Sequence, residues 1–129
     1  MTHHAPGWDE FCREFARRFA EHGYIAVVPN LFEQSGQGTP DDVAAAARGA
    51  GGVSDTSVIA DGQAALDLIK SMPTSNGKVG VIGTCSGGRH ALLVGTRVPG
   101  FGAIADLWGA NVVVTPDRLT PSSRRQSST

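Results

Sequence analysis

Apolar and polar residues alternate along the chain in blocks that predict helices and short strands in turn. Aromatic and apolar residues recur at helical spacing over residues 8–22, which predicts an amphipathic helix that Gly23 ends. The uniformly apolar run 24–28 predicts a strand buried on both faces. Residues 33–52 are rich in Gly, Ala and polar residues. We expect a mobile excursion there, in which residues 41–48 could form a short helix.

The second half of the chain predicts a βαβ unit preceded by a helix. Ser54 or Asp55 can cap that helix, its apolar face carries Ile59, Leu66 and Ile69, and Pro73 ends it. A strand, a helix and a further strand follow, and strands that alternate with helices favour a parallel sheet flanked by helices. The fold class expected is therefore α/β. The last three elements are predicted at residues 78–82, 86–97 and 101–105.

Composition narrows the partners that the chain is expected to have. The 129 residues, 40% of them hydrophobic, can supply the core of one small domain. A net charge of −1 gives no electrostatic drive toward nucleic acid or a membrane surface, and we expect neither as a partner. No apolar run approaches the roughly 18–20 residues of a membrane span, and Cys12 and Cys85 do not resemble a disulfide framework. We expect a cytoplasmic protein without a cofactor.

The glycine-rich segment around Cys85 carries the clearest chemical signal. A short apolar strand leads into Gly-Thr-Cys-Ser-Gly-Gly and then into a helix, the setting of a nucleophile elbow with cysteine as the nucleophile. Gly83, Gly87 and Gly88 would keep neighbouring side chains clear of a sharp, strained turn. Cys85 would lie at a helix N-terminus, where the helix dipole stabilises a thiolate. The alternative is a glycine-rich turn with a buried structural cysteine, and the strand–turn–helix context favours the elbow.

Residues 73–88 resemble the strand and elbow of the dienelactone hydrolases, cysteine-nucleophile members of the α/β-hydrolase superfamily. Residues 3–7 resemble the family's loop after its third strand, and residues 21–32 resemble its next helix end, strand and turn. The resemblance extends over residues 3–114. It implies that Cys85 attacks a small ester or lactone. It also implies that the N–H groups of Ser86 and Ala5 form an oxyanion hole, and that His4 is a candidate for lining the substrate pocket. Trp108 is a second pocket candidate because it lies near the edge of the sheet where active-site groups gather.

The chain departs from the family pattern at several points. His4 stands where the family commonly has glutamate, and Asn30 stands where aspartate is usual. The family takes its catalytic aspartate and histidine from later segments, and no residue here can be assigned to either role. We expect a partial hydrolase domain over residues 1–114, without the strand before residue 1 and without the C-terminal strands. A disordered tail is expected over 115–129.

These departures leave more than one function open. The first is a dienelactone-hydrolase-like hydrolase of small esters or lactones, incomplete as given. The second is a non-catalytic remnant that binds a partner, or associates with itself, through unpaired strand edges. A redox-sensing thiol at Cys85 is a third.

The remaining polar candidates favour structural roles. Neighbouring residues such as His3 and His4 rarely bind one ion, and no cysteine or carboxylate appears at ligand spacing from them, so we expect no metal site. His90 is expected to be a packing or surface histidine rather than a general base. Asp106 is expected to serve a cap or a turn. Trp108 fits a core position as well as a pocket.

Overall fold

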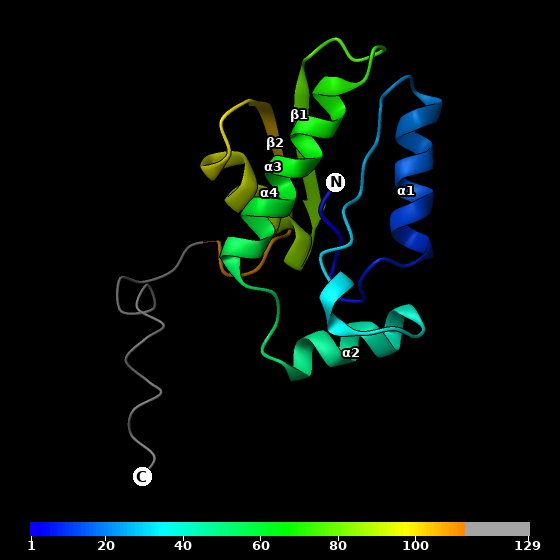
Figure 1. Ribbon diagram of the computed structural model, residues 1–129, viewed down its shortest axis with the longest axis vertical. Helices are drawn as coiled ribbons and strands as arrows, with labels where there is room; N and C mark the ends of the chain where they lie inside the picture. The colour runs from blue at the N-terminus through cyan, green and yellow to red at the C-terminus, as the bar shows by residue number, and fades with distance from the viewer. Residues whose placement is uncertain (113–129) are drawn as a thin grey trace.

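The computed structural model describes residues 1–112, which form a mixed α/β unit (Figure 1). The expected tail over residues 115–129 lies outside this described part. None of the described helices is both long enough and apolar enough to cross a membrane. In chain order the elements are α1 (Glu10–Glu21), the short 3₁₀ helix η1 (Glu33–Ser35), α2 (Pro40–Gly49), α3 (Asp55–Ser71), β1 (Val79–Thr84), α4 (Ser86–Arg97) and β2 (Phe101–Leu107).

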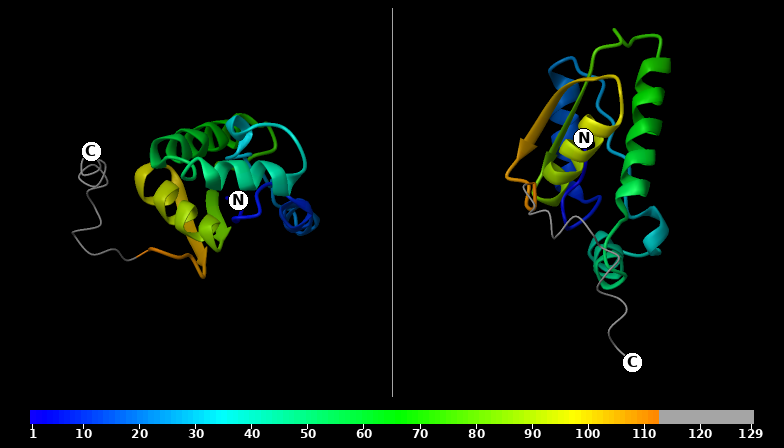
Figure 2. Two further views of the ribbon diagram at one scale, coloured as in Figure 1. Left: turned by 90° about the horizontal axis from the view of Figure 1, so that it is seen from below. Right: turned by 90° about the vertical axis from the view of Figure 1, so that its left-hand side faces the viewer.

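The predicted βαβ unit is confirmed. Strands β1 and β2 pair in parallel, with Val81 opposite Ile104, and α4 connects them and packs on both. Helix α3 packs against α4, while α1 stands apart from this layer (Figure 2). The core takes its buried side chains from β1, α2, α3 and α4 and from residues just before η1 and just after α4: Leu31, Phe32, Ala44, Ala47, Val58, Leu66, Val79, Val81, Ala91, Val94 and Val98.

Local capping chemistry explains where the helices begin. Ser54 caps α3, because its Oγ accepts the N–H of Ser57 at 3.1 Å. Helix α1 begins at Glu10, later than predicted, because Asp9 takes the cap position and accepts the N–H of Cys12 at 3.1 Å. Helix α4 has the predicted bounds.

The expectation of a mobile excursion over residues 33–52 is wrong, since that stretch contains η1 and α2. A reciprocal capping box begins α2: Thr39 Oγ1 accepts the N–H of Asp42, and the Asp42 carboxylate accepts the N–H of Thr39. Pro40 at the first helical position suits this start. Burial of Ala44 and Ala47 in the core then holds the helix in place.

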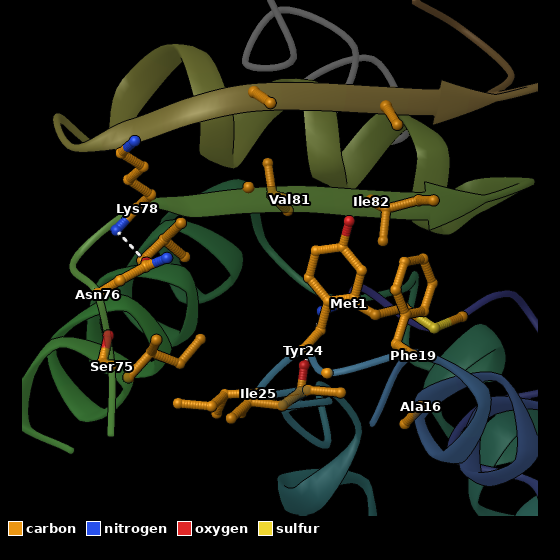
Figure 3. Close-up of a pocket in the computed structure, with 18 of the residues that line it drawn as sticks. Met1, Ala16, Phe19, Tyr24, Ile25, Ser75, Asn76, Lys78, Val81 and Ile82 are labelled. Atoms are coloured by element: carbon orange, nitrogen blue, oxygen red, sulfur yellow. Dashed lines mark hydrogen bonds between the residues drawn. The ribbon is translucent and has the colours of Figure 1, made fainter. Parts of the chain in front are cut away.

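The predicted buried strand at residues 24–28 is also wrong. This segment has no strand assignment, and the side chain of Tyr24 is 63% exposed. A strand requires a hydrogen-bonded neighbouring strand. In the described part this segment instead bonds to the Met1 ammonium (to Val27 O, 2.7 Å), to the Trp8 indole (to Val28 O, 3.0 Å) and to Phe19 O (from the N–H of Tyr24, 3.1 Å). A groove of about 550 Å³ separates the segment from β1, and the ring of Tyr24 points toward β1 across it (Figure 3).

The contact between α3 and α4 yields a stability prediction. A Cβ added at Gly62 of α3 would lie 2.5 Å from Val94 Cγ1 of α4, inside the packed core. We expect Gly62→Ala to lower the free energy of unfolding by about 1–3 kcal/mol through overpacking. Gly49→Ala is the control, since a Cβ there meets nothing within 4 Å. It should change stability by less than about 1 kcal/mol. Urea unfolding followed by circular dichroism measures both, and equal effects would contradict the packing argument.

Candidate active site

Cys85 occupies the turn between β1 and α4 with a strained backbone. Its φ is 55° and its ψ is −125°, a conformation that residues other than glycine rarely adopt. Two hydrogen bonds fix the turn: the N–H of Cys85 donates to Leu107 O at 3.0 Å, and its carbonyl accepts the N–H of Gly88 at 2.9 Å. The Cys85 side chain is exposed. The turn therefore presents a thiol to solvent from a rigid backbone.

The elbow glycines allow three backbone segments to meet around this turn. A Cβ at Gly83 would overlap the carbonyl of Gly87, and one at Gly87 would overlap the carbonyl of Thr2. A Cβ at Gly88 would overlap the carboxylate of Asp106. The close approach of main chain to main chain thus requires glycine at Gly83 and Gly87, while the Asp106 carboxylate occupies the space beside Gly88.

The N-terminal segment lies directly beside the elbow. The N–H of Thr2 donates to Ile82 O at 2.9 Å, its hydroxyl donates to Gly87 O at 2.7 Å, and Thr2 forms an isolated parallel bridge with Gly83. The loop that contains Ala5 follows, and Arg48 donates to the carbonyl of Ala5 at 3.1 Å. Ser86 is the first residue of α4, and its N–H therefore has no acceptor within the helix.

Of the histidines near the elbow, His3 is buried and His90 is half-buried. His3 Nδ1 donates to His4 O and its Nε2 accepts the N–H of Leu31, both at 3.0 Å, and burial lowers the pKa of His3. Burial, with Arg89 nearby, lowers the pKa of His90 to about 4. Its buried Nδ1 has no hydrogen-bond partner among residues 1–112. Both rings are thus neutral at pH 7.

His4 belongs to a cluster that sequence analysis missed. Its Nε2 lies 2.9 Å from Asp9 Oδ2, and with Cys12 Sγ these donor atoms all lie within 4.8 Å of one another. The expectation that no cysteine or carboxylate lies at ligand spacing is therefore wrong. The signal was present: Asp9 is a recognisable cap, and Cys12 follows it by three residues, on the same side of α1. Burial raises the pKa of the Cys12 thiol to about 11.

Trp108 and Asp106 lie at the end of β2. Trp108 has a φ of 49° and is 75% exposed, so it is not a core residue. Asp106 accepts the N–H of Gly109 at 2.7 Å and so serves a turn, as predicted. The groove of about 550 Å³ runs along the free edge of β1, and Cys85, His4 and Trp108 do not line it.

The parallel β1–α4–β2 unit with a strained residue at its turn defines part of an α/β-hydrolase fold. The family model of the dienelactone hydrolases matches residues 1–127. The chain belongs to the dienelactone hydrolase family, which confirms the resemblance noted in its sequence.

Comparison with curated proteins gives relatives of the same kind. Carboxymethylenebutenolidases from Pseudomonas putida and Pseudomonas knackmussii are each 32% identical over 103 residues, which cover 70% of this chain and 41% of the relative. A relative from Synechocystis sp. is 26% identical over 112 residues, covering 82% of this chain and 45% of its own length. The chain thus spans less than half the length of these relatives.

The two cysteines should differ in reactivity. Cys85 is exposed at a helix N-terminus, whereas Cys12 is buried with a pKa raised to about 11. We expect iodoacetamide to modify Cys85 at least about tenfold faster than Cys12 in the folded protein between pH 7 and 9, because the thiolate is the reacting form. Mass spectrometry of the two peptides measures both rates. The difference in rate should vanish in urea. Equal rates without urea would count against the assignment of Cys85 to an exposed helix N-terminus and of Cys12 to a buried site.

Proposed function

We propose that this protein takes part in the hydrolysis of a small ester or lactone, with Cys85 as the nucleophile. The strained, exposed position of Cys85 at the β1–α4 turn is the observation that carries the proposal. The substrate class follows from membership of the dienelactone hydrolase family and from relatives named as carboxymethylenebutenolidases.

The reaction would proceed through an acyl-enzyme. The thiolate of Cys85 attacks the carbonyl carbon, and the resulting oxyanion accepts hydrogen bonds from the N–H groups of Ser86 and Ala5. Each such donor is worth about 3 kcal/mol in the transition state. Collapse of the intermediate breaks the ester bond and leaves a thioester on Cys85, while the leaving oxygen takes up a proton. Water then cleaves the thioester, which releases the acid and regenerates the thiol.

The described residues do not provide an evident general base for these steps. His3 uses both ring nitrogens in hydrogen bonds, and the pKa of His90 is about 4. His4 pairs with Asp9, and no hydrogen bond links it to Cys85 in the described part. Loss of the triad base in a serine protease lowers kcat by about 10⁶-fold. We therefore expect turnover by the 129-residue chain to be slow compared with that of a chain extended to the length of its relatives.

Substitution of Cys85 tests this mechanism directly. We expect Cys85→Ala to abolish hydrolysis of p-nitrophenyl acetate and of a dienelactone by a chain extended to the length of its relatives. Cys85→Ser should retain less than about 1% of the activity. A serine hydroxyl stays protonated at neutral pH unless a base activates it, and is then a much weaker nucleophile than a thiolate. Cys12→Ser is the matched control and should keep the parental rate. Undiminished turnover by Cys85→Ala would exclude Cys85 as the nucleophile.

A second candidate function, self-association or partner binding through strand edges, is supported by the groove beside β1. Apolar side chains line this groove, among them Val81, Ile82, Tyr24 and Ile25 (Figure 3). Tyr24 and Ile104 are exposed. An unpaired strand edge next to exposed apolar surface favours association with another strand.

The pairing of Thr2 with Gly83 predicts how this groove can be filled. A strand fused ahead of Met1 would continue parallel to β1, and the ammonium of Met1, whose pKa burial lowers to about 6, would become an amide. We expect a six-residue Val/Ile-rich extension to raise Tm by at least about 5 °C and to suppress association, because each buried unpaired backbone group costs about 1–3 kcal/mol. Thermal unfolding and size-exclusion chromatography measure both effects.

A Gly/Ser extension of equal length is the control for this experiment. It adds the same number of peptide groups but has little tendency to form a strand or to bury apolar surface. The opposite result is a parent chain that is monomeric and that unfolds as cooperatively, and at as high a temperature, as the chain with the Val/Ile extension. It would show that no additional strand is needed in the groove.

A further inference from the structure

The loop that leads into α1 brings together three side chains able to bind a metal. His4 Nε2 lies 2.9 Å from Asp9 Oδ2, and Cys12 Sγ lies within 4.8 Å of both. An ion at the centre of such a triangle would lie within about 2.5 Å of every donor atom, close to the roughly 2.0–2.3 Å of zinc–ligand bonds. Shifts of a few tenths of an ångström would complete the coordination.

The local structure already orients two of these donors. Asp9 uses Oδ1 to cap α1 through the N–H of Cys12, which leaves Oδ2 facing His4. The ring of His4 packs 4.9 Å from that of Phe11, centroid to centroid. Cap and packing therefore restrict the rotamers of both side chains, so that little further ordering is needed to bind an ion.

Burial around the cluster leaves one side open. The Cys12 side chain is fully buried, whereas the side chains of His4 and Asp9 are 19% and 26% exposed. An ion can enter from the side of His4 and Asp9, and a water molecule can take a fourth position there. His3 cannot be that ligand, because its ring nitrogens bond to His4 O and to the N–H of Leu31.

The donor types select the metal. Imidazole nitrogen, carboxylate oxygen and thiolate sulfur suit zinc, while calcium and magnesium prefer oxygen ligands alone. We propose that His4, Asp9 and Cys12 form a Zn²⁺ site with a solvent molecule as the fourth ligand. On binding, the Cys12 thiol releases its proton to solvent as the zinc–sulfur bond forms. His4 gives up the hydrogen bond from Nε2 to Asp9 Oδ2 and takes the tautomer protonated on Nδ1, which frees Nε2 for the zinc–nitrogen bond. The bound ion would link the loop before α1 to its first turn, and this role is independent of hydrolysis at Cys85.

Cobalt substitution tests the proposal with a signal specific to the sulfur ligand. Titration of the 129-residue chain with Co²⁺ should show one equivalent bound, a thiolate-to-cobalt charge-transfer band and tetrahedral visible bands that Zn²⁺ displaces. Cys12→Ser should lose the charge-transfer band. His4→Gln and Asp9→Asn should weaken binding by at least about a hundredfold, since loss of supporting groups alone weakens metal sites by 10–100-fold. Cys85→Ser is the control and should bind as the parent does.

A stability measurement keeps the test independent of the buried Cys12 position. Zn²⁺ should raise Tm for the parent and for Cys85→Ser, but not for His4→Gln, whose altered side chain is partly exposed. Any of three results would overturn the proposal. These are a parent chain without the thiolate-to-cobalt charge-transfer band, loss of that band in Cys85→Ser, and a zinc-dependent Tm shift in His4→Gln equal to that of the parent.

Discussion

The contact of three backbones at the end of β1 is the constraint on which the rest of the described structure depends. Thr2 donates to Ile82 O and to Gly87 O, and so ties the N-terminal segment to both the strand and the helix that follows it. Side chains at Gly83 or Gly87 would prevent this approach. The same contact brings the backbone of Thr2 and His3 against the start of the helix that follows Cys85. Glycine there is thus a requirement of packing as well as of the turn.

Strand pairing decides which apolar residues are buried. Val79 and Val81 of β1 lie in the core because α4 and β2 pack around them. The equally apolar segment 24–28 lies across a groove from β1, and Tyr24 remains exposed. Hydrophobicity makes burial favourable, but a strand also needs partners for its N–H and C=O groups. The apolar pattern alone therefore overestimated the order of this segment.

Polar contacts across the loop before α1 separate two adjacent histidines. His3 turns inward, where its ring nitrogens satisfy the backbone at His4 and Leu31. His4 turns toward Asp9, close to the thiol of Cys12. Adjacent residues in an extended segment point to opposite sides, so His3 serves the backbone and His4 belongs to the proposed zinc site. Because only one of the two histidines faces the cluster, their adjacency in the sequence did not indicate a metal site.

The sequence by itself determined the features that depend on near neighbours. The bounds of α4, a cap for α3 at Ser54 or Asp55, and the turn at Cys85 followed from glycine spacing, caps and periodicity, since these act over a few residues. The family followed from the resemblance of residues 73–88 to its strand and elbow. The residues of the α2 capping box were also readable in the sequence. The Gly-, Ala- and polar-rich composition around them favoured a mobile segment instead. Only the tertiary structure decided the exposure of Tyr24, which depends on which distant backbone groups find partners, and no local pattern specifies that. The convergence of His4 with Cys12 was signalled in part by the cap at Asp9 and the spacing of Cys12, but the direction of the His4 side chain depends on how the loop before α1 packs.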